Sequence, residues 1–152
     1  MKTVLHLKNV PFVPKYLQEL IVKTFQLAPF EKVDLIVPVP ISKVRLSERG
    51  FNQASLLAKP LSKMTKIKLD ETALIRHIHT KRHSPGMDKK ARQMSVKQAF
   101  SVASPEKVKG RNILLIDDVF TSGATASNCA IALKEKGALK VYVLAVARAF
   151  II

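Results

Sequence analysis

Two adjacent carboxylates follow a short apolar run in the last third of the chain. The run is 113–116, the acids are Asp117 and Asp118, and a Thr-Ser-Gly turn at 121–123 leads into a helical pattern near Thr125. This order predicts a buried strand, a tight turn and a helix N-terminus, whose N–H groups, hydroxyls and helix dipole bind an anion such as phosphate. Carboxylates repel phosphate, so the acid pair is expected to serve hydroxyl groups or a metal ion on the same ligand. A ligand with both a phosphate and a diol is a sugar phosphate.

The elements that must position these residues alternate along the chain. Strands are expected at 34–39, 74–75, 100–102 and 140–147, and helices at 14–27, 51–64, 89–97 and 126–136. The apolar runs lack clean period-two alternation, which is typical of a parallel sheet covered on both faces. In such open α/β sheets ligands bind beyond the carboxyl ends of the strands, where Asp117, Pro38 and Pro40 lie. Two separate loops are therefore expected to converge on one edge of the sheet.

Proline, glycine and aspartate set the expected limits of several elements. Pro60 lies inside the helical pattern 51–64 and is expected to kink or break that helix. Gly137 is expected to close the helix 126–136. The polar, basic stretch 77–86 is expected to be an exposed loop, after which Asp88 caps a short helix.

The composition favours one globular domain spanning residues 1–152. The chain has 152 residues and 47% hydrophobic content, which is enough for a full core and excludes a disordered chain. No apolar run is long enough to cross a bilayer, and residues 1–8 lack the apolar core of a signal peptide, so a cytoplasmic protein is expected. A single cysteine, Cys129, excludes an internal disulfide and a cysteine-cage zinc site, and it is expected to be a small buried hydrophobe. The oligomeric state stays open, and an oligomer is compatible with the sequence.

The net charge of +15 favours a phosphorylated ligand or a polyanion as partner. The alternative is a solvated surface that is rich in lysine. The charge is uneven, because between Arg76 and Lys97 seven arginines and lysines face the single acid Asp88. This unevenness favours a functional positive field, and clustered cations of this kind suit the backbone phosphates of nucleic acid.

Residues 113–125, with the helix and the strand that follow, resemble the phosphoribosyl pyrophosphate (PRPP) binding signature of type I phosphoribosyltransferases. Residues 34–57, with Pro-Val-Pro at 38–40 and Glu-Arg-Gly-Phe-Asn-Gln at 48–53, resemble the ComF family, which is phosphoribosyltransferase-like and associated with competence for DNA uptake. A weaker similarity joins Arg92, Val96 and Ala99-Phe100 to the same family. The resemblance implies a type I phosphoribosyltransferase-like fold, an open parallel sheet flanked by helices.

The resemblance also implies roles for individual residues. Those implied to bind PRPP are Asp117, Asp118, Thr121, Ser122, Gly123, Ala124 and Thr125. Those implied for the pyrophosphate loop are Pro38, Val39, Pro40, Lys43, Arg45 and Arg49. The acid pair would accept hydrogen bonds from the ribose hydroxyls and help to hold Mg²⁺ indirectly, since oxygen ligands suit this ion. The candidates for binding nucleic acid are Lys81, Arg82, Lys89, Lys90 and Arg92.

Each of these roles has a simpler alternative. An Asp-Asp pair alone is equally consistent with acids that cap a strand end or meet solvent, and the attached turn favours the ligand. The Ser and Thr residues of the turn would also cap a helix, which is compatible with phosphate binding. Any one of Lys43, Arg45 and Arg49 is an ordinary surface charge when taken alone.

Two functions follow from the resemblance. The first is a ComF-like protein that binds Mg-PRPP and acts in DNA uptake and natural transformation, handling single-stranded DNA. The alternative is an active phosphoribosyltransferase that transfers phosphoribose from PRPP to a nucleobase-like acceptor in nucleotide salvage. The chain lacks the four-cysteine zinc module with which such proteins commonly begin. It also departs from the usual Thr-x-x-Gln, because Lys81, Arg82 and His83 follow Thr80 and Ser95 replaces an expected Asn. These departures favour ligand binding over turnover, and no catalytic residue is identified.

Overall fold

A four-stranded parallel sheet forms the centre of the molecule. The structure, a computed structural model, describes residues 11–77 and 99–148. The sheet has the order β2-β1-β5-β6, formed by β2 (Lys68–Leu69), β1 (Leu35–Pro38), β5 (Asn112–Phe120) and β6 (Lys140–Arg148). Every neighbouring pair is parallel, with Ile36 opposite Leu114 and Ile116 opposite Leu144. The expected open parallel sheet is confirmed.

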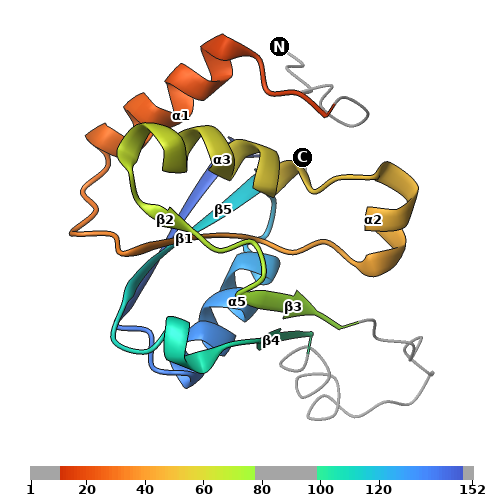
Figure 1. The fold of residues 1–152 in the computed structure, drawn as a ribbon, viewed down its shortest axis with the longest axis vertical. Coiled ribbons are helices and arrows are strands. Elements are labelled where there is room, and N and C mark those ends of the chain that lie inside the picture. The colour runs from red at the N-terminus through yellow and green to blue at the C-terminus, as the bar shows by residue number, and fades with distance from the viewer. Residues whose placement is uncertain (1–10, 78–98, 149–152) are drawn as a thin grey trace.

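Helices cover both faces of this sheet. The helices α1 (Lys15–Leu27) and α3 (Gln53–Thr65) lie on one face, and α5 (Ala124–Glu135) lies on the other (Figure 1). Beside α5 a two-stranded antiparallel ribbon, β3 (Leu74–Arg76) and β4 (Phe100–Val102), covers the part of that face under β1. The result is a three-layer α/β arrangement.

The strand sequences explain why both faces must be covered. In β1, Leu35 and Val37 face α5 and the ribbon, whereas Ile36 faces α1 and α3. In β5, Ile113 and Leu115 also face α5 and the ribbon. The buried residues that alternate with them face α1 and α3. These side chains are fully buried, and burying each one contributes roughly 1.5–3 kcal/mol relative to an exposed side chain.

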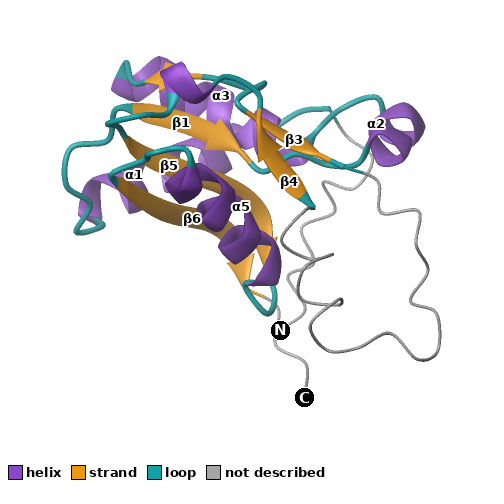
Figure 2. Ribbon diagram, turned by 90° about the horizontal axis from the view of Figure 1, so that it is seen from below, coloured by secondary structure: helices purple, strands orange, loops and turns teal. Residues whose placement is uncertain are grey.

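A short helix after β1 was not expected from the sequence. It is α2 (Lys43–Arg49), and none of its residues is buried. The hydroxyl of Ser42 accepts a hydrogen bond from the N–H of Arg45 at 3.3 Å, and Gly50 ends the helix at φ 77°. Local caps rather than an apolar face define this helix, and Figure 2 shows it standing away from the sheet.

Two expectations about element limits were wrong. β5 does not end at Ile116 but continues through the acid pair to Phe120, because β6 is long enough to pair with it as far as Arg148. Pro60 does not break α3, which runs on to Thr65. The residues around Pro60 that face the sheet, Leu57 and Leu61, are fully buried, and this packing holds the helix together across the missing N–H.

Other expectations hold, and some lie outside the described residues. β1, β3, β4, β6, α1 and α5 lie where they were expected, and Cys129 is buried in α5. The predicted helix 89–97 and nearly all of the predicted loop 77–86 fall between the described ranges. Within residues 11–77 and 99–148, no helix is both long enough and apolar enough to span a membrane.

Candidate functional site

The acid pair lies in the last third of β5, at the carboxyl edge of the sheet. Asp117 is 9% exposed and Asp118 is half-buried. A carboxylate oxygen of Asp117 accepts a hydrogen bond from the N–H of Asp118 at 2.9 Å, and Asp118 accepts one from the N–H of Val119 at 2.9 Å. The two carboxyl groups are therefore held by adjacent backbone groups in fixed positions.

The surroundings of Asp117 disfavour its negative charge. Burial raises the pKa of Asp117 to about 6, and the neighbouring charge of Asp118 adds to the rise. A carboxyl group with this pKa is still mostly ionised at neutral pH, so the folded site carries an unfavourable buried charge. A cation or a hydroxyl donor at this position would relieve both the desolvation and the repulsion.

The turn after β5 can lie close to the ring of Phe120 because its central residue is glycine. Gly123 adopts φ 77°, and a Cβ at this position would lie 2.7 Å from Cζ of Phe120. The hydroxyl of Ser122 accepts a hydrogen bond from the N–H of Ala124 at 3.4 Å. At the start of α5 the first N–H groups have no intrahelical partner, as in any α-helix, and Thr121 and Ser122 are exposed beside them. The structure therefore brings the predicted residues 121–125 together at one helix N-terminus.

The loop after β1 lies at the same edge. Pro38 and Val39 are buried, and both backbone groups of Val39 are used inside the protein. Its N–H donates to the carbonyl of Ile116 at 2.9 Å, and its carbonyl accepts from the amide of Asn52 at 3.0 Å. These two hydrogen bonds fasten the end of β1 to β5 and to the start of α3, so Val39 positions the loop rather than offering groups to a ligand.

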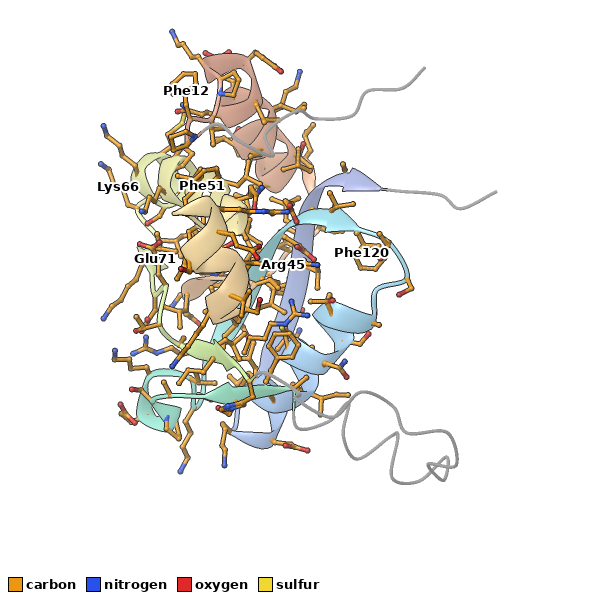
Figure 3. The ribbon with its side chains drawn as sticks, turned by 90° about the vertical axis from the view of Figure 1, so that its right-hand side faces the viewer. Phe12, Arg45, Phe51, Lys66, Glu71 and Phe120 are labelled. Carbon is orange, nitrogen blue, oxygen red and sulfur yellow. The ribbon has the colours of Figure 1, made fainter. Side chains whose placement is uncertain are left out.

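The cations predicted for the pyrophosphate loop differ in exposure and in hydrogen bonding. Lys43 and Arg45 are exposed on α2, and Figure 3 shows Arg45 toward the same edge of the sheet as Phe120. Arg49 is half-buried, and its guanidinium donates to the amide oxygen of Gln53 at 3.0 Å. Pro40 is half-buried in the connection to α2. Lys43 and Arg45 are therefore the cations best placed to move toward a ligand.

One positioning residue escaped the sequence reasoning. Asn52 caps α3 by accepting a hydrogen bond from the N–H of Ala54 at 3.1 Å, and the same side chain holds the carbonyl of Val39. An Asn directly before a helical pattern is the signal that could have identified the cap. Its second bond, across thirteen residues to the end of β1, was not visible from spacing.

The described residues alone do not form a metal cage. No group of three or more His, Cys, Asp and Glu side chains within residues 11–77 and 99–148 converges to hold a metal ion. Two carboxylates suit Mg²⁺ when the ligand and water supply the remaining oxygens. The chemistry of the acid pair therefore fits a magnesium ion that arrives with a phosphorylated ligand. The nucleic-acid candidates at 81–92 lie outside the described residues.

Several curated proteins are similar in sequence. Competence protein F of Haemophilus influenzae is 34% identical over 119 residues, which cover 76% of this chain and 51% of that protein. The DNA utilization protein YhgH of Escherichia coli K12 is 36% identical, over 76% of this chain and 49% of that protein. Competence protein ComFC of Bacillus subtilis is 37% identical, over 75% of this chain and 44% of that protein. The chain thus spans about half the length of these relatives, and no protein-family model matches it.

Several solved structures share this fold, and purine and adenine phosphoribosyltransferases are among them. The purine phosphoribosyltransferase of Pyrococcus horikoshii is 14% identical with a TM-score of 0.55, covering 91% of this chain and 86% of that chain. The glutamine PRPP amidotransferase of B. subtilis is 22% identical with a TM-score of 0.57, covering 86% of this chain and 25% of that one. These likenesses establish the type I phosphoribosyltransferase fold. Over the region matched by its competence-protein relatives, the chain belongs to the ComF family.

Proposed function

We propose that this chain is the Mg-PRPP-binding domain of a protein that acts in DNA uptake. The observation that carries the proposal is the acid pair of β5, which lies directly before the anion-binding turn and the start of α5. The names of the relatives, competence proteins and DNA utilization proteins, support the cellular role. The shared phosphoribosyltransferase fold supports the choice of ligand.

In the proposed complex each part of the site meets one part of PRPP. Asp117 and Asp118 accept hydrogen bonds from the ribose hydroxyls, and residues 121–125 enclose the 5′-phosphate through N–H groups and hydroxyls. Lys43 and Arg45 approach the pyrophosphate. Magnesium, when bound, neutralises part of the pyrophosphate charge, and the acid pair helps to hold it through the diol or water.

The first test measures PRPP binding directly. Isothermal calorimetry with Mg²⁺ and PRPP should show binding to the unchanged protein, and the double variant Asp117→Asn, Asp118→Asn should bind no PRPP. The matched control, Glu106→Gln with Glu135→Gln, removes two exposed carboxylates elsewhere and should bind as the unchanged protein does. Equal binding by the double aspartate variant would sink the site assignment.

A second candidate function is transfer of phosphoribose to a nucleobase-like acceptor. The observation that favours it is an apolar hollow of about 570 Å³ beside the turn, lined in part by Phe120, Gly123, Ala145 and Ala147. A flat acceptor would fit against the Phe120 ring and the small side chains of Ala145 and Ala147. Against it, His77 is the only histidine among the described residues, and its ring is already bonded to the hydroxyl of Ser101 at 2.7 Å. Pyrophosphate release with a panel of nucleobases would establish turnover, and a silent panel would leave the binding function.

The proposal that the chain binds DNA leads to a separate prediction. With a net charge of +15, the chain should bind single-stranded DNA with an affinity that falls steeply with salt. Replacing Lys81, Arg82, Lys89, Lys90 and Arg92 by Gln should flatten the slope of log K against log salt by about 0.7 for each phosphate contact removed. Fluorescence anisotropy with a labelled oligonucleotide measures this slope.

The matched control for DNA binding removes the same number of positive charges from described elements of the chain. Replacing five exposed lysines of α1, α3 and the chain that follows α3 should change the slope less; these are Lys15, Lys23, Lys63, Lys66 and Lys68. An equal loss in both variants would show that only the overall charge matters. Unmeasurable affinity of the unchanged protein at low salt would end the DNA proposal.

A further inference from the structure

Arg76, the last residue of β3, directs its guanidinium toward the core side of the ribbon. Along β3 Leu74 is buried, Ile75 is exposed and Arg76 is half-buried, so Leu74 and Arg76 share the face that packs toward α5. Cζ of Arg76 lies over the ring of Phe100, 5.5 Å from its centroid. Phe100 is the residue opposite Arg76 in the ladder, and it is 6% exposed. The side chain is thus ordered by stacking rather than extended into solvent.

The position of Arg76 relates it to the candidate site. β3 lies between α5 and α2 in Figures 1 and 2, and these are the helices that carry the turn and the free cations. Burial raises the pKa of the Cys129 thiol to about 12; the Asp117 carboxylate adds to the rise and the Arg76 guanidinium opposes it. Phe100, on which Arg76 stacks, packs in the same core cluster as Cys129, which is one helical turn below Thr125 in α5.

The described residues give Arg76 no anionic partner. In residues 11–77 and 99–148 the ion pairs are all formed by lysines, and no carboxylate there pairs with Arg76. In the remainder of the chain the only acidic side chain is that of Asp88. A half-buried charge without a partner costs free energy, so an anion at this position would be favoured. The planar fork of arginine matches phosphate oxygens in particular.

We infer that Arg76 is a ligand-binding residue whose guanidinium hydrogen-bonds to a phosphoryl oxygen of the ligand held by the acid pair and the turn. The inference rests on the proposed function for the identity of the ligand, PRPP. It adds a third cationic element to the site, alongside the helix N-terminus of α5 and the lysine and arginine of α2. Phe100 holds the guanidinium in place before the ligand arrives.

The test compares three arginine variants by calorimetry. Arg76→Met keeps an apolar side chain over Phe100 but removes the charge, and Mg-PRPP should bind about 30-fold more weakly or worse, as when one partner of a buried charge pair is lost. Arg76→Lys keeps the charge without the planar fork. Its affinity for Mg-PRPP should lie between those of the unchanged protein and Arg76→Met. The control Arg111→Met removes one arginine just before β5, at the opposite edge of the sheet, and should leave affinity unchanged.

Two simpler ligands identify the phosphoryl group and separate this inference from the proposed function. Ribose 5-phosphate and magnesium pyrophosphate each carry one of the two phosphorylated parts of PRPP, and the ligand that loses affinity in Arg76→Met identifies the part that Arg76 contacts. If PRPP binds the unchanged protein and Arg76→Met equally, the inference fails and the function stands. If PRPP does not bind but either simpler ligand binds in an Arg76-dependent way, the function fails and the inference stands. If none of the three ligands binds, both fail.

The competing structural role is an ion pair with Asp88. In that case Asp88→Asn and Arg76→Met would lower the melting temperature equally, and neither would change PRPP affinity, which would overturn the inference. We expect Asp88→Asn to leave PRPP affinity unchanged. We also expect ligand-free Arg76→Met to melt no lower than the unchanged protein, because no pair is lost.

Discussion

Asp117→Asn should stabilise the ligand-free protein at neutral pH, although it removes a residue of the proposed PRPP site. The direction of this change in stability follows from the linkage between protonation and folding. The pKa of Asp117 is raised from 3.8 to about 6 in the folded state, first by burial and then by Asp118. Below pH 3.8 both folded and unfolded states carry the protonated acid, so its charge costs nothing. As pH rises from 3.8 to about 6 the unfolded state ionises first, and the folded state loses stability until the penalty becomes constant.

The expected gain is moderate. A shift of about two pKa units corresponds to at most about 3 kcal/mol, and contact with solvent and with the coupled Asp118 reduces this to about 1–2 kcal/mol. The amide oxygen of the substituted side chain would still accept the hydrogen bond from the N–H of Asp118, so this buried N–H is not left unpaired. Melting temperatures of the variant and the unchanged protein, measured without ligand at about pH 7.5 and about pH 4, give the comparison.

Asp118→Asn is the matched control. It removes the repulsion but leaves Asp117 buried, and burial is the larger cause of the shift, so its gain should be smaller. The same melting temperature difference at both pH values, or a destabilised Asp117→Asn variant, would contradict this account. The expected pattern is a site that is less stable than it could be because its acids are kept for a ligand.

Gly123→Ala should destabilise the fold and abolish binding of Mg-PRPP. Two costs add at this residue. A left-handed φ of 77° disfavours any side chain by roughly 1–2 kcal/mol, and the new Cβ would meet the ring of Phe120 at 2.7 Å. Relief of this contact requires the ring or the turn to move, and the turn is the part proposed to enclose the phosphate. Thermal unfolding and calorimetry measure the two losses.

Gly110→Ala separates the two costs. Gly110 has nearly the same conformation, φ 73°, but nothing lies within 4 Å of its added Cβ. It should show the conformational cost alone and bind PRPP normally. The variant Gly123→Ala with Phe120→Leu should recover part of the stability that Gly123→Ala loses. If Gly110→Ala and Gly123→Ala cost the same stability and affinity, contact with Phe120 has no part in shaping the turn.

The sequence predicted the elements that are defined by periodicity and the motif that is defined by local order. Branched apolar runs identified β1 and β5, and the small-residue pattern after Gly123 identified α5 with Cys129 inside. α2 was missed because none of its seven residues is buried, so it has no apolar stripe to detect. β2 was missed because two residues, Lys68 and Leu69, form a strand only through the edge of β1.

Features that depend on contacts between distant parts of the chain could not be predicted from the spacing of residues in the sequence. Pairing of Ile75 with Ser101 creates an antiparallel ribbon where two separate short strands were expected. The full length of β5 depends on β6, so the acids lie within the strand rather than after it. The types of the site residues were readable in the sequence, but the burial that raises the pKa of Asp117 is a property of the packed sheet.

The ribbon makes one part of the chain exchangeable. β3 and β4 join the two ends of residues 78–98, since the N–H of His77 donates to the carbonyl of Ala99 at 2.9 Å, and the ribbon shares no ladder with the main sheet. The free energy of closing a loop changes slowly with its length. Evolution or an engineer can therefore lengthen, shorten or replace this stretch without disturbing the register of β1, β5 and β6. One phosphoribosyltransferase-like scaffold can in this way accept many different segments at this position.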